Sequence, residues 1–289
     1  MKTSKLLLIL VFAAGVSNSC SQSASSPADP YLQKDWAKNA LWDDGKAEVI
    51  TYDAERVVYG KSRSFEYTYV LVKETFNKEY QVKTDAYDRN DLYEVMKINK
   101  FCRIPTMKYP YHYLTSVFLK RDNASLVHKL TNTSQEWCGN TAKSFVEDEN
   151  NYRYQYMSYW DGQGNGTDKL RKGPWFEDQL SYTLRTLNFE EGITFDILLY
   201  PMQISSRANL PEAEIATISV TKANAEDLSD IDPAFVSNPW KVNVSRAEEP
   251  DLSFWINGEY PNYLLRMEAT DGRKLSMKSL IRDAYWEHE

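Results

Sequence analysis

The chain has 289 residues, of which 41 are acidic and 34 are basic, and its formal net charge is −7 at pH 7. An acidic chain lacks the electrostatic attraction to phosphates on which nucleic-acid binding depends, so we expect no nucleic-acid partner. The 20 Tyr, 11 Phe and 8 Trp supply large apolar areas that suit sheet faces and binding grooves.

Residues 1–19 have the pattern of a secretory signal peptide. Lys2 and Lys5 precede an apolar run from Leu6 to Val16, and small or polar residues then lead directly to Cys20. The run is too short to cross a bilayer of about 30 Å as a helix, so we expect cleavage. Loss of the two lysines changes the formal net charge from −7 to −9, and no later apolar run is long enough to span a membrane.

The four residues from Ser17 to Cys20 resemble the lipobox of bacterial lipoproteins. The resemblance implies that Cys20 carries acyl chains, which together hold a protein on a membrane. Residues 20–33 are rich in Ser, Ala and Pro and predict a flexible tether. We therefore expect an outer-membrane lipoprotein that faces the periplasm, and the alternative is a soluble secreted protein with an incidental cysteine.

The remaining residues, 34–289, predict a single antiparallel β-rich domain. A short helix is expected near residues 36–41, where apolar residues have helical spacing. Short apolar or alternating segments then predict strands, which cover residues 47–52, 56–60, 65–71, 92–104, 111–120 and 152–159.

One longer helix is expected in the second half of the chain. Pro174 can open it, and Phe176, Leu180, Leu184 and Leu187 recur on one face as far as residue 188. Strands are then expected at residues 193–199, 214–220, 240–244, 252–256, 264–270 and 274–277, the last two joined by an Asp-Gly turn.

Many strands with few helices predict a mainly β fold, namely a curled antiparallel sheet or open half-barrel with one or two covering helices. Residues 224–239 are acidic and contain few apolar side chains. They predict a long surface loop, and the alternative is a boundary within the domain.

Cys102 and Cys138 are the cysteines that remain if Cys20 is lipidated. In an oxidising compartment they can form one disulfide, and the alternative is two separate thiols. A third interpretation makes Cys138 a nucleophile with His112 or His128 as its base, because a thiolate needs a proton acceptor within hydrogen-bond reach.

No pattern in the sequence predicts a metal or a cofactor. The chain has three histidines, none at metal-binding helical spacing, and no C-x-x-C pair. Residues 161–166 partly imitate a calcium loop, but Lys172 stands where such a loop carries its bidentate Glu, so a flexible hairpin is expected there. Neither a G-x-S-x-G elbow nor a phosphate-binding loop occurs.

Two resemblances concern the mature chain. Residues 239–242, 254–256 and 263–272, with Trp240, Trp255 and the Asp-Gly turn, resemble uncharacterised envelope proteins of the DUF3108 kind. This implies a relationship to lipoprotein-carrier half-barrels, in which a curved antiparallel sheet wraps around a helix. Residues 109–113 and 134–141 are similar to hypothetical lipoproteins labelled as Maf-type septum-formation inhibitors, but the paired Arg that opens a Maf pyrophosphatase is missing here.

The leading hypothesis is therefore a non-enzymatic, membrane-tethered protein that binds a lipid or another apolar or amphiphilic ligand in the concavity of its sheet. The second is a structural or adaptor lipoprotein that binds another envelope protein through exposed aromatic residues. The third is a thiol hydrolase that uses Cys138. Fold analogy supports the first hypothesis only weakly, since one fold serves many functions.

Overall fold

A computed structural model describes residues 27–288 of the chain. The predicted signal peptide, Cys20 and the first part of the predicted tether lie outside the described residues. Within the described range, sixteen strands join in one sheet, and no helix there is long and apolar enough to span a membrane.

The bounds of the elements are as follows. The strands are β1 (Ala47–Val58), β2 (Lys61–Asn77), β3 (Val82–Lys83), β4 (Leu92–Ile104), β5 (Tyr111–Lys120), β6 (Val127–Glu136), β7 (Gly139–Asp148), β8 (Asn151–Met157), β9 (Asn165–Arg171), β10 (Trp175–Phe176), β11 (Thr194–Tyr200), β12 (Glu214–Lys222), β13 (Trp240–Arg246), β14 (Leu252–Ile256), β15 (Leu264–Ala269) and β16 (Lys274–Asp283). The helical elements are α1 (Leu180–Thr183) and the 3-10 turns η1 (Asp29–Tyr31), η2 (Trp36–Lys38), η3 (Ala40–Asp43), η4 (Glu177–Gln179), η5 (Leu184–Thr186), η6 (Ala225–Leu228), η7 (Pro233–Phe235) and η8 (Tyr285–Glu287).

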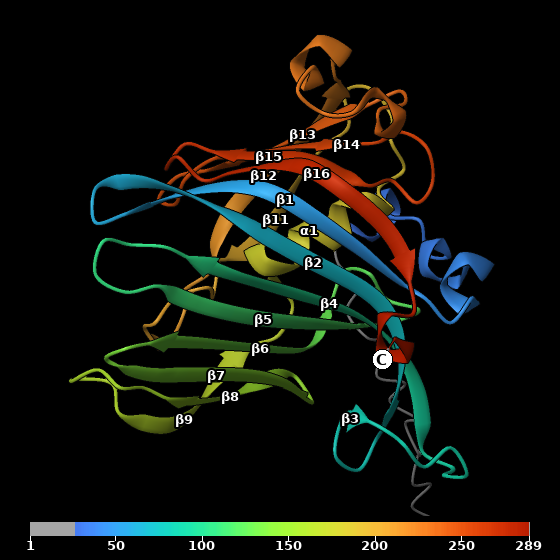
Figure 1. The fold of residues 1–289 in the computed structure, drawn as a ribbon. Helices are drawn as coiled ribbons and strands as arrows, with labels where there is room; N and C mark the ends of the chain where they lie inside the picture. Colours follow the sequence, from blue (N-terminus) through green and yellow to red (C-terminus); the bar gives the residue numbers. More distant parts are fainter. Residues whose placement is uncertain (1–26, 289) are drawn as a thin grey trace, which may run out of the picture.

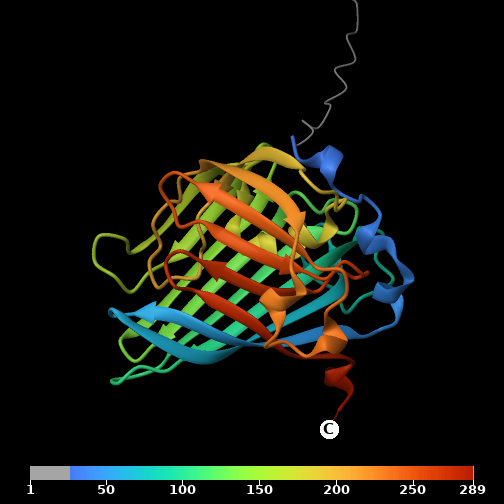
Figure 2. The ribbon, with the colours of Figure 1, turned by 90° about the horizontal axis from the view of Figure 1, so that it is seen from above.

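The sheet runs in the order β10-β11-β12-β13-β14-β15-β16-β1-β2-β4-β5-β6-β7-β8-β9, with β3 paired to the end of β2. Neighbouring strands are antiparallel except β10 and β11, which are parallel. The sheet curls so that its β4–β9 part faces its β11–β16 part (Figures 1 and 2). It stays open, because β9 and β10 are edge strands. The predicted curled antiparallel sheet is confirmed.

The concave side of the sheet is filled by the chain itself. The segment from η4 through α1 to η5 lies inside the curl (Figure 1). Its apolar residues Leu180, Leu184 and Leu187 are fully buried. Burial of such side chains stabilises the fold by about 1.5–3 kcal/mol each.

The expected long helix at 174–188 is wrong in form. The leucines with helical spacing do lie in the core, but Trp175 and Phe176 are extended in β10 and the rest is three short turns. The charged residues of η4 point to partners on the sheet and a loop, and Arg246 binds Glu177. These tertiary contacts favour the extended and short helical segments over one continuous helix.

Smaller differences concern the N-terminal half. The expected helix at 36–41 is two 3-10 turns, and the two strands expected at 47–60 form one strand, β1. The end of the predicted tether is packed on the domain, because Ala28 and Leu32 are buried and Leu32 forms a bridge with Leu187. The ordered fold therefore starts before residue 34, where the domain was predicted to begin.

Candidate functional site

Two successive rows of inward-facing residues on the concave sheet are polar. The first row pairs Lys100, Thr115, Asn132 and Lys143 directly across β4, β5, β6 and β7. The second row lies two residues nearer the β4–β5 and β6–β7 turns and consists of Tyr67, Cys102, Tyr113, Ser134 and Thr141. We call these two rows the polar band.

The two lysines of the polar band are buried and lack a carboxylate partner. Lys100 and Lys143 are 4% and 3% exposed. The Lys100 ammonium donates to the carbonyl of Asp178 at 2.6 Å, and that of Lys143 donates to the carbonyl of Gln203 at 2.5 Å. Because burial penalises the charged form, the pKa of each lysine is lowered to about 8. Within residues 27–288 neither lysine forms an ion pair.

Asp178 of η4 projects toward these lysines without closing a salt bridge. It is 2% exposed, and its carboxylate oxygen Oδ2 accepts the backbone N–H of Gln203 at 2.8 Å. Burial raises the pKa of this carboxyl, although the nearby lysines oppose the shift. The cations and the carboxylate thus share one region but bind peptide groups rather than each other.

Four polar side-chain atoms of this region lack a hydrogen-bond partner among the described residues. They are Asp178 Oδ1, Asn132 Oδ1, Ser134 Oγ and the Tyr67 hydroxyl. All four side chains are at least nine-tenths buried. A buried polar atom without a partner costs about 1–3 kcal/mol, so these four atoms make the polar band a candidate binding site.

Residues 201–213, between β11 and β12, contain no helix or strand, and we call them the covering loop. Its carbonyl groups accept hydrogen bonds from side chains on three separate strands of the sheet. The donors are Lys143 to Gln203, Arg56 to Ile204, Thr141 to Ser206 and Tyr154 to Ala208. A loop of this length without regular structure is uncommon in compact domains and is often functional.

Two depressions are lined in part by residues at the start of the covering loop. One, of about 530 Å³, is lined by Lys143, Gln203 and the acidic residues Glu248 and Glu249 among others. The other, of about 420 Å³, is lined by Arg56, Met202, Ile204 and Arg273 among others. Each depression thus reaches a cation beside the start of the covering loop, Lys143 in the first and Arg56 in the second.

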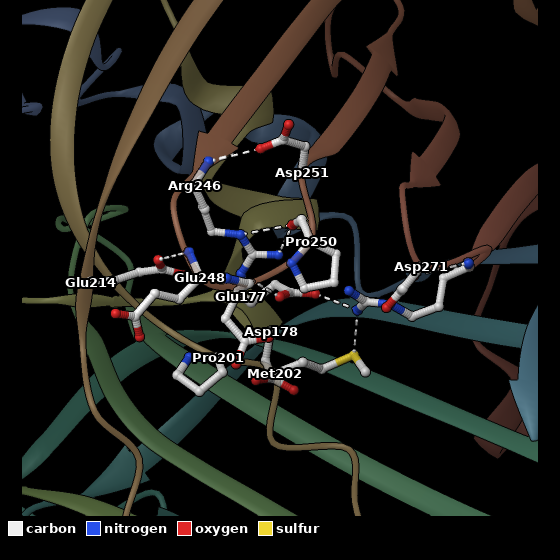
Figure 3. A network of polar contacts seen from close by, with 12 residues as sticks. Glu177, Asp178, Pro201, Met202, Glu214, Arg246, Glu248, Pro250, Asp251 and Asp271 are labelled. Carbon is white, nitrogen blue, oxygen red and sulfur yellow. Dashed lines mark hydrogen bonds and ion pairs between the residues drawn. The ribbon is translucent and has the colours of Figure 1, made fainter.

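A neighbouring network supports the position of Asp178. Glu177 receives hydrogen bonds from Arg246 at 2.9 Å and from Arg273 at 2.5 Å. Figure 3 shows Glu177 beside Arg246 and Pro250, with Asp178 and Met202 on the side of the covering loop. Both carboxylate oxygens of Glu177 are bound, so this network is structural and fixes η4 beneath the loop.

The two cysteines are apart in the structure. Both are free thiols, with Cys102 buried on β4 and Cys138 exposed in the β6–β7 turn. Strands β4 and β6 are separated by β5, which places them about 10 Å apart, whereas a disulfide needs Cα atoms within about 7 Å. The structure thus has two separate thiols, which is one of the two arrangements that the sequence left open.

Cys138 is also separate from both candidate bases. The only polar contact of its Sγ among the described residues is with the Tyr109 hydroxyl, at 3.4 Å. His128 lies at the opposite end of β6, and His112 is exposed on the outer face of β5. Burial raises the pKa of the Cys102 thiol to about 12, which disfavours its thiolate. The structure does not assemble the thiol site that the sequence suggested.

His128 belongs to a charged cleft of about 940 Å³ at the other end of the curl. Its ring nitrogens bind the Tyr93 hydroxyl at 2.6 Å and Glu147 at 2.7 Å, and Glu147 also pairs with Lys120 and Lys172. These neighbours hold the pKa of the Glu147 carboxyl well below its usual range, against the opposing effect of its burial. The charges of this cleft thus largely satisfy one another.

No group of three or more His, Cys, Asp or Glu side chains is placed to hold a metal ion within residues 27–288. The segment that imitates a calcium loop forms the β8–β9 turn, and β9 begins within it at Asn165. Gln163 of this turn binds Asn209 and the backbone N–H of Ala208, so the turn helps to hold the covering loop.

Four residues of this region were not predicted from the sequence as site residues, namely Arg56, Lys100, Lys143 and Asp178. A signal was present for Lys100, because it stands in the inward-facing series Ile98, Lys100, Cys102 and Ile104 of an expected strand. A lysine on an otherwise apolar strand face is unusual unless it has a buried partner or a function.

No family model and no curated protein matches the chain. Two solved structures are similar in shape. A β-barrel-like protein of the family DUF1849 from Brucella abortus is 8% identical, with a TM-score of 0.49 over 82% of this chain and 98% of that one. A DUF1089 family protein from Pseudomonas aeruginosa is 11% identical, with a TM-score of 0.37 over 58% and 82%. Neither is of the DUF3108 kind, and the low TM-scores carry no functional inference.

Proposed function

We propose that this protein is a non-enzymatic binding protein that holds an amphiphilic ligand in the concavity of its sheet, beneath the covering loop. The lipobox resemblance adds the proposal that acyl chains on Cys20 tether it to the periplasmic face of an outer membrane. A relationship to lipoprotein carriers, as the DUF3108 resemblance implies, fits the same function.

The observation that carries the proposal is the polar band. Natural interiors pair nearly all buried polar groups. Here two buried ammonium groups bind peptide carbonyls and lack carboxylate partners, and four buried polar atoms lack any hydrogen-bond partner among the described residues. A polar head group would satisfy these atoms if the covering loop moved aside.

An apolar part of the ligand would find aromatic side chains next to the polar band. Arg56 lies over the ring of Tyr113, which is followed by a continuous series of ring contacts through Tyr111 and Tyr109 to Trp137. Trp137 is 77% exposed, so this series leads from the buried cations to the surface. Tyr and Trp provide apolar rings with a polar edge, which suits an amphiphile.

The test is to incubate the purified mature protein with vesicles of envelope lipid, re-isolate it and identify extracted molecules by mass spectrometry. We expect one amphiphile in near-stoichiometric amount. Lys143→Met should reduce the recovered amount, whereas Lys169→Met, on the exposed edge strand β9, should not change it. Recovery of no lipid, or equal recovery with both variants, would contradict the proposal.

A second candidate function is an adaptor, and the hairpin turns favour it. Tyr59, Met107, Trp137 and Tyr159 lie in four turns at the same end of the sheet and are 57–82% exposed. Grouped exposed aromatic residues are typical of protein interfaces. Crosslinking in intact cells from position 107, compared with the outward-facing Thr167 of β9, tests this: a specific protein adduct at position 107 alone supports the adaptor.

A further inference from the structure

Three cations lie beside the start of the covering loop without an ion-pair partner in the described part of the chain. Arg56, Lys100 and Lys143 form no ion pair within the described residues, and Asp178 is the one carboxylate close to both lysines. The Glu177 carboxylate is already bound by two arginines. Arg56, Lys100 and Lys143 are therefore available to bind an anion, while the carboxylates nearest to them are Asp178 and the glutamates at the mouth of the depression.

Peptide carbonyls of the covering loop occupy two of these cations. Gln203 accepts from Lys143, and Ile204 accepts from Arg56 at 3.1 Å. A charged oxygen forms a stronger hydrogen bond with an ammonium or guanidinium group than a neutral carbonyl does. An oxyanion can thus replace the loop carbonyls at both positions and gain the unused N–H groups of the lysines.

The unpartnered atoms refine the chemistry of such an oxyanion. The Tyr67 and Ser134 hydroxyls can donate to it, whereas Asn132 Oδ1 and Asp178 Oδ1 can only accept and would need a donor such as a head-group N–H. Tetrahedral phosphate offers several oxygens in different directions, and Lys and Arg are its usual partners. A planar carboxylate reaches fewer of these groups at once, so phosphate fits better.

The outer side of the same depression has the opposite charge. Glu212, Glu214, Glu248 and Glu249 line the 530 Å³ depression together with Lys143. None of these four carboxylates forms an ion pair with a basic residue among residues 27–288, and Glu214 accepts the backbone N–H groups of Glu248 and Glu249. A free anion would be repelled at this entrance, whereas a positively charged group would be attracted.

We infer that the head group bound here is zwitterionic, with its phosphate on Arg56, Lys100 and Lys143 and its ammonium group among the four glutamates. This rests on the proposed function and names the ligand class of the same site. The acyl chain then follows the aromatic series from Tyr113 to Trp137, away from the acidic side.

The test compares four probes with the mature protein by calorimetry, each amphiphile below its critical micelle concentration. The probes are lysophosphatidylethanolamine, lysophosphatidylglycerol and monoacylglycerol with the same acyl chain, and inorganic phosphate. We expect affinity to fall in the order zwitterionic, anionic, neutral. The phosphate arm distinguishes a free-phosphate site from a lipid site.

Variants separate the two halves of the head group. Lys143→Met should weaken the binding of both phospholipids about tenfold, because one charge-assisted hydrogen bond is lost. The binding of monoacylglycerol should not change. The double variant Glu248→Gln, Glu249→Gln should reduce the affinity for the zwitterionic probe to that for the anionic probe. Lys169→Met is the control, and Lys100→Met on a different strand replaces Lys143→Met should the latter fail to fold.

The outcomes distinguish this inference from the proposed function. Equal affinity for the three amphiphiles overturns the zwitterionic head group but leaves amphiphile binding intact. Binding of inorganic phosphate alone, abolished by Lys143→Met, supports the phosphate site and overturns amphiphile binding. Preference for the anionic over the zwitterionic probe overturns the role of the glutamates. Binding of no probe overturns both.

Discussion

The concave face of strands β2, β4, β5, β6 and β7 carries two layers, one apolar and one polar. One inward row is entirely apolar and consists of Leu71, Ile98, Val117, Leu130 and Phe145. It belongs to one buried cluster that Phe176 and Tyr200 complete. The adjacent row, two residues along each strand, is the first row of the polar band. The same strands thus form a core layer that packs on apolar side chains and a layer whose polar side chains need hydrogen-bond partners from outside the sheet.

The difference shows how a β fold can separate stability from binding. An apolar layer is satisfied by contact alone, whereas a polar layer needs partners in defined directions. The polar band obtains part of its partners from peptide groups of the covering loop, and some of its atoms have none within the described residues. Substitutions in the two layers should therefore have opposite consequences.

The largest expected effect is in the apolar layer. Phe145→Ala removes a fully buried ring whose centroid lies 4.4 Å from that of the stacked Tyr154 ring. We expect a loss of about 3–5 kcal/mol in the free energy of unfolding. Phe101→Ala, at a 45% exposed position on β4, is the matched control and should cost under about 1 kcal/mol. Urea unfolding measures both, and equal losses would contradict a layered core.

A change in the polar band should have a smaller effect that depends on pH. Lys100 has its pKa lowered to about 8 in the folded protein, from 10.5, so the unfolded chain binds its proton more tightly. Stability should therefore rise with pH between about 8 and 10.5, by at most about 3 kcal/mol from this residue.

Lys100→Met isolates this contribution, because tyrosines that titrate in the same range act equally in both proteins. The unfolding free energy of the variant minus that of the unchanged protein should therefore fall as pH rises from 8 to 10.5, with the variant equal or more stable at pH 7. A difference that is independent of pH would contradict the lowered pKa of Lys100 in the folded protein.

Loosening the covering loop should have a local effect. Thr141→Val removes the hydrogen bond to the Ser206 carbonyl, and we expect about fivefold faster hydrogen exchange in residues 201–213, equivalent to about 1 kcal/mol. Thr167→Val on the exposed face of β9 is the control. Unchanged exchange in the loop would mean that this bond does not hold it.

The smallest effect is expected at the cysteines. Alkylation of the folded protein should modify Cys138 and spare Cys102 until the chain is unfolded, and Cys138→Ser should change stability by less than about 0.5 kcal/mol. Peptide mapping gives the result. Protection of both thiols with a mass lower by two hydrogens would instead establish the disulfide.

The sequence predicted those strands whose buried face is apolar or aromatic. The strands expected at 92–104 and 111–120 match β4 and β5, and the stretch at 152–159 overlaps β8. Strands β6 and β7 were missed, because inward positions such as Asn132, Ser134 and Lys143 are polar and remove the alternation that marks a strand.

The candidate site was missed for the same reason. Its residues come from β1, β2, β4, β5, β6, β7, η4 and the covering loop, so no short motif contains them. The residues that sequence motifs did single out, Cys138 and His128, lie at opposite ends of β6. Only the register of the sheet brings Lys100 and Lys143 into one row.

Hydrogen exchange with mass spectrometry of the mature protein, with and without envelope lipid, tests the central claim most directly. Lipid should change exchange in residues 201–213 and in the turn at 137–138, and should leave the charged cleft unaffected, as measured on residues 78–94, 120–128 and 147–149. Unchanged exchange in the covering loop, or a change confined to the charged cleft, would contradict a ligand beneath the loop.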